Sequence, residues 1–484
     1  MGAGAASRCR AHTFEQLPER FSPSPLVQAP PPFQELLAEA RAMAAELEPD
    51  GVLSLAMPLS PIDPLASLPL LAEPTGDGFQ FLWDGAPGLC IAAAGRCNSL
   101  ELSGLRRFEL AQRFATATLG RLGTAATTPA LARPRVLLAF GFFDAPLHPS
   151  DASVPGVQAV LPRWQLSRHG QHCWLHLNQS LGGGATPRQV AEELWEMGRR
   201  LMASPVLPLA GTPSLEPTSS ARPWEGLYRA AAERGLELVN SGELQKLVLA
   251  VRQEVVLQQP TDPLSLLAPL RRHQGGSCRF LWQRDHHAAL LGASPERLLT
   301  VRSGQLRSDA LAGTAAWNNG NALMHSDKDR REHELVVEAI TSGLQQAGLT
   351  PRRPRRPRLA RHGRLVHLHT PITAPLAGRH ALALAASLHP TPAVAGLPRR
   401  EAIRWLRSLE PFERGHYAAP IGWIDSAGDT DLRVAIRSGT LRGRRLELTA
   451  GAGLVRGSQL ERELQEVTLK LGVLQQQLSV PLSS

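Results

Sequence analysis

The sequence predicts an α+β fold with antiparallel sheet, and three observations support this class. Hairpin patterns, in which two apolar strands flank a short polar turn, recur along the chain, most clearly at residues 419–451. Helical patterns stand between them, for example at 187–202 and 224–242. At 484 residues and 43% hydrophobic, the chain has ample material for a large core.

Clusters of proline, glycine and serine divide the chain into three parts. The stretch SPSPLVQAPPP at 22–32 predicts a flexible lead. The longest disruption, ASPVLPLAGTPSLEPTSSARP at 203–223, is the best candidate for a linker. We therefore expect a lead at 1–35, an N-terminal half at 36–220 and a C-terminal region at 224–476.

A weak internal sequence similarity relates the two halves. FQFLWDGAPGLCIAAAG (79–95) resembles CRFLWQRDHHAALLGAS (278–294), because each has an aromatic-Leu-Trp strand, a polar turn and a second apolar strand ending in small residues. Chance and duplication explain this similarity about equally well. If it reflects duplication, the two halves contain related sheets that pack together.

The net charge of +9 raises the question of nucleic-acid binding. Much of the charge lies in PRRPRRPRLARHGR at 351–364. Prolines at every third position prevent a recognition helix, and the segment has no aromatic residues for base stacking. We therefore favour a solvated, proline-stiffened loop and expect no nucleic-acid partner. An anionic small substrate would benefit from the same positive field.

The sequence shows no sign of a membrane or a secretory route. No apolar run approaches the roughly 18 residues that a membrane-spanning helix needs. The opening MGAGAASRCRAH lacks the apolar core of a secretory signal, although a weak transit-peptide reading stays open. Five cysteines without close pairing suggest neither a disulfide framework nor a zinc site. These features predict a cytoplasmic protein without a membrane partner.

Lysine is scarce in this chain. Of 52 basic residues only three are lysine, namely Lys246, Lys328 and Lys470. Genomic base composition accounts for the scarcity but not for the positions that keep lysine. Arginine stays protonated at any working pH, whereas a desolvated lysine can lose its proton. A buried lysine is therefore a candidate for proton chemistry, although lysines that extend out of a core are common.

Lys246 lies in the apolar run ELQKLVLAVR at 243–252. Strand alternation places it on one face with Val248, while Leu247 and Leu249 occupy the other. The leucine face belongs to the core. The lysine face must therefore meet a pocket or a layer that tolerates charge.

Three carboxylates stand on two predicted helices. Glu332, in the helix that begins at Ser326 or Asp327, shares a face with apolar residues. Glu463, Glu466 and Lys470 form one stripe of the C-terminal helix. An exposed, salt-bridged face explains that stripe taken alone. Together with Glu332, it offers two or three carboxylates for a hard divalent cation such as Mg²⁺.

Glu296 is a further candidate for chemistry. It follows a strand that ends in small residues, in GASPERLL at 292–299. A carboxyl group beside a pocket can act as a general acid if burial raises its pKa. The same letters are also an ordinary helix start.

The glycine-rich stretch GAGLVRG at 451–457 lies between a strand and an acidic helix. It is not the dinucleotide fingerprint, because its third glycine is out of register and the acidic helix would repel a pyrophosphate. A tight turn is the simple interpretation. The functional one is that exposed backbone N–H groups bind a carboxylate.

Together these pieces resemble the chorismate-binding enzyme family, which comprises anthranilate, aminodeoxychorismate, salicylate and isochorismate synthases. The resemblance covers about residues 224–476. It rests on GASPERLL, SDALAGT (308–314), KDRREHELV (328–336), HPTPAVAGLP (389–398), AIRSGT (435–440), AGAGLV (450–455) and ERELQEVTLKL (461–471). The fold it implies is a large antiparallel α/β sandwich in which helices cover two packed sheets. HPTPAVAG looks like the isochorismate synthase form.

The resemblance implies a Mg²⁺-dependent isomerisation of chorismate to isochorismate. Glu332 and Glu466 would hold the metal, with Glu463 close by. Lys246 matches the water-activating lysine of the family, which adds water at C2 of the substrate. Glu296 would protonate the departing C4 hydroxyl.

The resemblance also implies residues that bind the substrate. The implied carboxylate anchors are Arg437, the Gly451 and Gly453 amides, and Lys470, and the implied pocket-lining residues are Thr314 and His389. Asp309 stands where relatives often carry glutamate, and we attach no catalytic role to it.

Two other functions stay open. A salicylate synthase would share Lys246 and the metal site and would go on to eliminate pyruvate. A non-catalytic protein that binds nucleic acid through 351–364 is the alternative from another class. The long N-terminal half looks like the form that serves menaquinone or phylloquinone synthesis, and we expect a monomer or weak homo-oligomer.

Overall fold

The structure is a computed structural model in which the described residues are 30–48, 51–72, 76–85, 88–125, 128–147, 154–204 and 224–477. The N-terminal part contains α1 (Phe33–Ala45), β1 (Val52–Leu59), α2 (Pro64–Leu71), β2 (Gln80–Asp84), β3 (Cys90–Leu102), α3 (Arg107–Gly120), β4 (Leu122–Gly123), β5 (Arg135–Phe140), β6 (Val157–His169), β7 (His172–Ser180) and α4 (Pro187–Ala203). Most of the predicted lead and of the predicted linker lies outside the described residues.

The C-terminal part carries the remaining elements. These are α5 (Trp224–Asn240), β8 (Lys246–Val256), α6 (Pro263–His273), β9 (Cys278–Gln283), β10 (Ala289–Ser294), β11 (Arg297–Arg302), β12 (Gln305–Ala316), α7 (Gly320–His325), α8 (Asp327–Gln346), β13 (Arg358–His362), β14 (Leu365–Pro375), α9 (Ala381–Leu388), β15 (Gly396–Leu397), α10 (Arg399–Leu409), β16 (Pro420–Asp425), β17 (Thr430–Val434), β18 (Ser438–Arg442), β19 (Arg445–Val455) and α11 (Leu460–Gln477). Among the described strands, the pairing is antiparallel except between β1 and β4. The predicted α+β class is confirmed.

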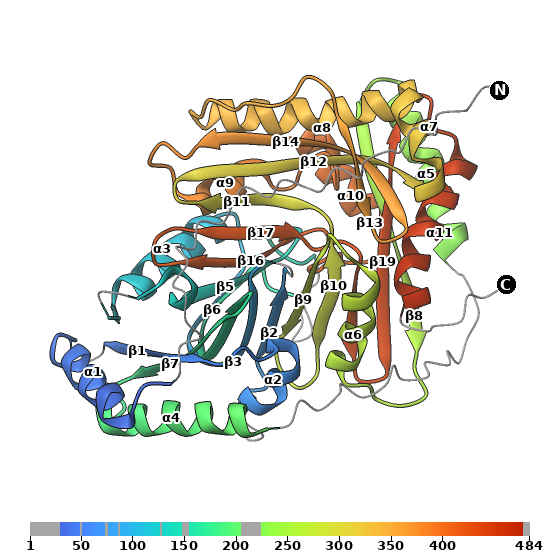
Figure 1. Ribbon diagram of the computed structural model, residues 1–484. Helices are drawn as coiled ribbons and strands as arrows, with labels where there is room; N and C mark the ends of the chain where they lie inside the picture. The colour runs from blue at the N-terminus through green and yellow to red at the C-terminus, as the bar shows by residue number, and fades with distance from the viewer. Residues whose placement is uncertain are drawn as a thin grey trace, which may run out of the picture.

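Two pairings join the N-terminal and C-terminal parts into one hydrogen-bonded sheet network (Figure 1). The two similar stretches, 79–95 and 278–294, form the hairpins β2–β3 and β9–β10. Strand β2 pairs with β9, so that Phe81 lies opposite Trp282 and Trp83 opposite Phe280. Strand β5 pairs with β16 in the same way. The two similar hairpins therefore meet edge to edge.

Strand alternation sends the side chains of β2 and β9 into two hydrophobic cores. The first core is an aromatic cluster that includes Phe81, Trp83, Phe280, Trp282 and Trp423. Leu82 and Leu281, which alternate with these residues, belong instead to the larger core that packs against the helices. The layers of the predicted sandwich follow from this division.

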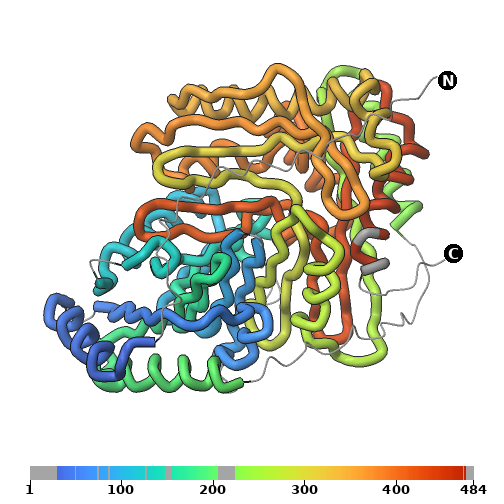
Figure 2. Tube along the Cα trace, viewed as in Figure 1, coloured from blue at the N-terminus to red at the C-terminus, as the bar shows by residue number. Residues whose placement is uncertain are grey.

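Three helices surround the C-terminal strands that carry the candidate residues. Helices α5 and α11 pack on β8 and β19, and α8 lies along β12 and β14 (Figures 1 and 2). Helix α8 begins as predicted, because the Ser326 hydroxyl accepts a hydrogen bond from the Asp329 N–H at 3.2 Å. Its buried face contains Val336 and Ile340 together with Glu332. The apolar face of α8 therefore carries a carboxylate inward.

The basic run at 351–364 is only partly a loop. Residues 358–362 form β13, which pairs with β14, so the predicted loop ends at Pro357. Arg352, Arg353, Arg355 and Arg356 are exposed, as expected. The described cysteines are free. Among the described helices, none has the length and apolar character needed to cross a membrane.

Candidate active site

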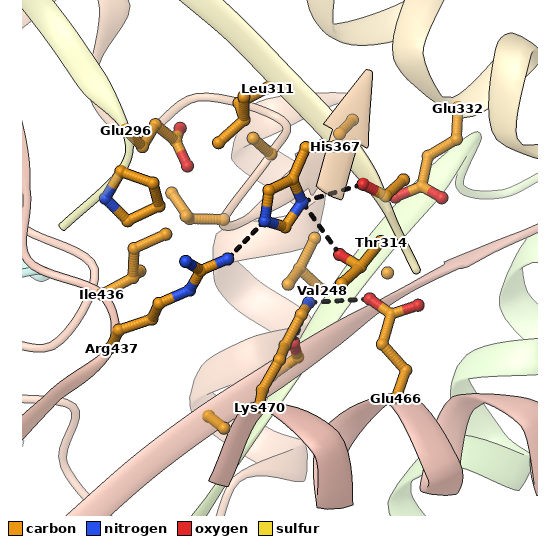
Figure 3. Close-up of a pocket in the computed structure, with 18 of the residues that line it drawn as sticks. Val248, Glu296, Leu311, Thr314, Glu332, His367, Ile436, Arg437, Glu466 and Lys470 are labelled. Atoms are coloured by element: carbon orange, nitrogen blue, oxygen red, sulfur yellow. Dashed lines mark hydrogen bonds and ion pairs between the residues drawn. The ribbon is translucent and has the colours of Figure 1, made fainter. Parts of the chain in front are cut away.

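One pocket brings together nine of the eleven candidate residues: Lys246, Glu296, Thr314, Glu332, Arg437, Gly451, Gly453, Glu466 and Lys470. Their elements include β8, β12, β19, α8 and α11. The pocket encloses about 740 Å³ of empty space, which includes its opening to solvent. Figure 3 places Glu296 and Arg437 on one side of His367, and Glu332 and Glu466 on the other.

The glycine stretch at the pocket is a strand and not the predicted turn. Strand β19 continues to Val455 because β8 pairs with it along its whole length, as far as Lys246. Strand β18, on the other edge of β19, pairs only as far as Thr449. One edge of residues 450–455 is therefore left without a strand partner.

The backbone of Gly451 and Gly453 points toward this open edge. These glycines lie opposite Ala250 and Val248 of β8, whose N–H groups bind the Glu410 carboxylate and the Ala395 carbonyl instead of β19. In antiparallel sheet, such non-hydrogen-bonded pairs direct their N–H and C=O groups away from each other. The two glycine amides are thus directed outward, where an anion can accept from them.

Lys246 is the first residue of β8 and is 1% exposed. Its strand face is as predicted, because Val248 lines the pocket with it while Leu247 and Leu249 lie in the core. The Lys246 Nζ forms an ion pair with Glu332 Oε1 at 2.9 Å. The charge that the apolar run carries is therefore compensated by the carboxylate of α8.

A buried ion pair fixes the other edge of β8. Arg414 donates to the Val248 carbonyl and to the Val394 carbonyl, each at 2.7 Å. Its partner Glu410 accepts from the Ala250 N–H at 2.9 Å. Backbone groups of β8 that have no strand partner here are satisfied in this way, and the strand that carries Lys246 is anchored to Arg414 and Glu410.

Gly453 allows the Lys246–Glu332 pair to lie directly on β19. A Cβ atom at this position would lie 2.6 Å from Glu332 Oε1 and 3.0 Å from Lys246 Cε. Real Cβ atoms do not approach other atoms so closely, so any side chain here displaces the pair. The glycine therefore leaves room for the ion pair against β19.

We expect Gly453→Ala to lower the free energy of unfolding by about 1–3 kcal/mol, because the added methyl group overpacks the Lys246–Glu332 contact. Chemical denaturation measures the change. Gly226→Ala on α5 is the matched control, since a Cβ there meets no atom within 4 Å. Equal stability of the wild type and Gly453→Ala would contradict the assigned packing.

The other two lysines also bind candidate carboxylates. Lys470 Nζ lies 2.7 Å from Glu466 Oε1 and donates to the Gly451 carbonyl at 2.7 Å. Lys328 Nζ lies 2.7 Å from Glu463 Oε1. Glu463 is 1% exposed and does not line the pocket, so it lies behind the other two carboxylates. Lys328, near the start of α8, is thus paired with a carboxylate of α11.

The lysines act on these carboxylates in opposition to burial. Burial raises the pKa of Glu332, but Lys246 and Lys328 lower it, and the net pKa lies below the ordinary value. Burial also raises the pKa of Glu463, and the nearby Lys328 ammonium only partly compensates. The two carboxyl groups therefore differ in how strongly they hold a negative charge.

The carboxylates have the chemistry of a hard-cation site but are not gathered as one. Oxygen ligands are those that Mg²⁺ and Ca²⁺ prefer. Within the described residues, however, no three Asp, Glu, His or Cys side chains come together around a common point. Instead, an ammonium group lies within 2.9 Å of each of the three carboxylates.

Glu296 is held in the link between β10 and β11 and is 4% exposed. Its backbone N–H donates to the Ser294 hydroxyl at 3.2 Å, and its carbonyl accepts from the Val434 N–H at 3.1 Å. Burial raises the pKa of its carboxyl from 4.5 to about 7, although Lys246 and Lys470 act in the opposite direction. Near neutral pH this group can both hold and donate a proton.

Arg437 presents a free donor to the pocket. Its φ of 50° lies in the left-handed region, which is unusual for a residue with a side chain, and its carbonyl accepts from the Ala293 N–H at 3.1 Å. One guanidinium nitrogen, Nη2, contacts His367 Nε2. The other, Nη1, is buried without a hydrogen-bond partner. A buried donor of this kind is suited to an anionic ligand.

His367 lines the pocket and was not among the predicted residues. Its Nδ1 lies 2.9 Å from the Gly313 carbonyl and 3.2 Å from the Thr314 hydroxyl. Burial and Arg437 lower the pKa of His367 well below its ordinary value, so the ring is neutral. Nδ1 then donates to Gly313, and Nε2 accepts from Arg437. The sequence signal was the alternation His367–Leu368–His369, which puts both histidines on one strand face.

His389 does not line the pocket, which corrects the expectation. Its Nε2 lies 3.1 Å from the Phe142 carbonyl, and its ring contacts Phe108 and Phe142. Burial lowers its pKa to about 3, so it is a neutral core histidine. Asp309 forms ion pairs with Arg297, Arg307 and His369.

The fold and the pocket define an α+β protein whose charged, partly enclosed site suits an anionic small molecule. A family model described as chorismate binding enzyme matches residues 37–479, and the chain therefore belongs to the chorismate-binding enzyme family. The match includes the divergent N-terminal half as well as the stretches that carry the resemblance.

Curated relatives are similar over about half of the chain. The chain is 40% identical over 281 residues to the salicylate biosynthesis isochorismate synthase of Pseudomonas aeruginosa, which covers 56% of this chain and 58% of the relative. It is 36% identical over 259 residues to isochorismate synthase DhbC of Bacillus subtilis, covering 50% and 65% of the two chains. The chain thus spans less than two thirds of the length of these relatives.

A solved structure is similar over most of the chain. The menaquinone-specific isochorismate synthase MenF from Escherichia coli has a TM-score of 0.73 and 27% sequence identity, and the match covers 92% of this chain and 99% of that one. The predicted fold type is confirmed by this likeness.

Proposed function

We propose that this protein is an isochorismate synthase, a Mg²⁺-dependent enzyme that converts chorismate into isochorismate. The observation that carries the proposal is the pairing of two groups in one pocket. A buried amine, Lys246, and a carboxyl group with a pKa of about 7, Glu296, line the same cavity. An isomerisation that adds water at one carbon and loses hydroxide from another needs one base and one acid.

The two carboxylates of chorismate find donors in the pocket. Arg437 offers its unpartnered Nη1, and Lys470 offers an ammonium held between Glu466 and Gly451. The outward amides of Gly451 and Gly453 add two further donors. Charge-assisted hydrogen bonds of this kind orient a planar carboxylate. Binding at both ends of the ring would fix its C2 and C4 atoms relative to the two catalytic groups.

In the proposed reaction, Lys246 takes a proton from water as the water oxygen bonds to C2. The ring double bonds shift, and the C4–O bond breaks. Glu296 gives its proton to the departing hydroxyl, which leaves as water. The proton gained by Lys246 and the proton lost by Glu296 balance through solvent, so substrate and product are isomers.

The carboxylates of Glu332 and Glu466 would hold Mg²⁺, with Glu463 behind them. When bound, the ion would neutralise the charge of a substrate carboxylate and strengthen the acid–base chemistry nearby. Support for this assignment comes from the all-oxygen donor set and from the positive charges that the carboxylates already attract.

We further propose that the product feeds quinone synthesis, and in particular the synthesis of menaquinone. The support is the likeness to a menaquinone-specific enzyme over 92% of this chain, including the N-terminal half. A siderophore or salicylate route is the alternative that the salicylate biosynthesis relative represents.

Incubation with chorismate and Mg²⁺ tests the proposal. We expect isochorismate as the product, identified by chromatography and mass spectrometry, without release of pyruvate. Stoichiometric pyruvate and salicylate would instead identify a salicylate synthase. No turnover together with strong, salt-dependent binding of DNA or RNA would favour the basic segment as the functional surface. Omission of Mg²⁺ is the matched control and should abolish product formation.

A further inference from the structure

Each of the three lysines in the chain binds one of the three candidate metal carboxylates. The pairs are Lys246 with Glu332 at 2.9 Å, Lys328 with Glu463 at 2.7 Å and Lys470 with Glu466 at 2.7 Å. The remaining 49 basic residues are arginine, and within the described part of the chain none of them pairs with these carboxylates. The pairs of Lys246 and Lys328 join different elements, β8 with α8 and α8 with α11, whereas Lys470 and Glu466 are one turn apart on α11.

The three pairs act as one electrostatic cluster. The carboxylate of Glu332 interacts not only with Lys246 but also with Lys328 and Lys470. Lys328 in turn interacts with all three carboxylates. The cluster is therefore balanced internally, with three positive and three negative charges. Among the described residues its carboxylates are not gathered as a metal site, and an ammonium group stands at each of them.

The choice of lysine over arginine has a physical reason in such a cluster. An ammonium group is a compact point charge, and in each pair the shortest contact runs to the Oε1 oxygen of the glutamate. A guanidinium group presents a planar fork that binds both oxygens of a carboxylate at once. A divalent cation therefore displaces an ammonium group more readily than a guanidinium group.

We propose that the three lysines are internal counter-ions that a divalent cation displaces when it binds. The inference deepens the proposed function, since it takes Mg²⁺ from that proposal. Displacement would free two residues that line the pocket, Lys246 as the proposed base and Lys470 as a proposed contact to the substrate. Metal binding would thus prepare both the metal site and the substrate contacts.

Lys328 offers the cleanest test, because it lies outside the pocket lining and its side chain is 25% exposed. Isothermal titration of Mg²⁺ into substrate-free protein measures the affinity. We expect Lys328→Gln to bind Mg²⁺ about tenfold more tightly, a change of about 1.4 kcal/mol, because an internal competitor is removed. Lys328→Arg keeps the charge, but its guanidinium group can bind both oxygens of Glu463. This variant should therefore bind Mg²⁺ about tenfold more weakly.

Arg353→Gln is the matched control. Arg353 forms an ion pair with Glu334, also on α8, at 2.7 Å. This substitution likewise removes one positive charge and one ion pair to α8. We expect no change in Mg²⁺ affinity, because Glu334 is not a candidate ligand. An equal gain in Arg353→Gln and Lys328→Gln would mean that net charge alone sets the affinity, which overturns the inference.

A second measurement uses the wild-type protein, so its outcome does not depend on whether a variant folds. Because the chain has three lysines, labelling with ¹³Cε-lysine gives three side-chain NMR signals. We expect all three to shift together as Mg²⁺ is added and to saturate at the same concentration. Signals that stay in place while Mg²⁺ binds, or an absence of Mg²⁺ binding, would overturn the inference. Chorismate turnover enters neither readout, so a failure of the proposed activity is seen separately.

Discussion

Replacing Lys246 with glutamine is expected to lower kcat for isochorismate formation by about 10³-fold, which is within the range that a positioned general base contributes. The buried amine lies at the carboxylate end of the pocket, beside Glu332. Glutamine has a similar shape and can still donate to Glu332, but it cannot accept a proton from water. Steady-state kinetics with chorismate and saturating Mg²⁺ measures the loss.

Binding of chorismate to Lys246→Gln should change by less than about tenfold, because the donors assigned to the substrate carboxylates remain. Arg252→Gln is the control, since Arg252 stands on the same face of β8 but outside the pocket lining, with Glu447 as its ion-pair partner at 3.5 Å. That variant should retain the wild-type kcat. Turnover by Lys246→Gln close to that of the wild type would remove Lys246 from the role of base.

Local signals in the sequence were sufficient to place most of the candidate site. Alternation along β8 identified the pocket face of Lys246, and helical spacing placed Glu332 on the buried face of α8. Both inferences depend on the geometry of one element, which sequence specifies well. The likeness of the stretches from Gly292 to Leu471 to a known family supplied the long-range assembly that periodicity does not reveal.

The errors arose where tertiary contacts override local preference. GAGLVRG looked like a turn, but pairing with β8 extends the strand through Gly451 and Gly453. His389 lies in a family stretch, yet its ring packs against Phe142 and its nitrogen binds a backbone carbonyl. The stripe on α11 indicated the pairing of Lys470 with Glu466, but the partners of Glu332 and Glu463 come from other elements and were beyond any local pattern.

The pH dependence of the rate should reflect Glu296. Because its carboxyl must be protonated to act as the acid, and burial raises its pKa to about 7, kcat/KM is expected to fall as the pH rises above 7. Glu296→Gln should lower kcat by about 10²–10³-fold, since glutamine has no proton to give. The alkaline limb of the pH profile should vanish in the residual activity of this variant. A limb that persists unchanged would assign the acid to another group.

The same carboxyl makes a second, independent prediction about stability. Its folded-state pKa of about 7 lies above the value of 4.5 for an unperturbed glutamate, so the folded state holds the proton more tightly than the unfolded chain does. The stability it contributes is fully present below pH 4.5 and is lost as the pH rises through 7. Glu296→Gln carries no charge to bury. The free energy of unfolding of the variant minus that of the wild type should therefore be about 3 kcal/mol larger above pH 8 than at pH 4.5. Denaturation curves of both proteins across this range measure the effect. A constant difference would mean that Glu296 ionises without cost in the fold, and it would then have no reason to hold the proton that the reaction needs.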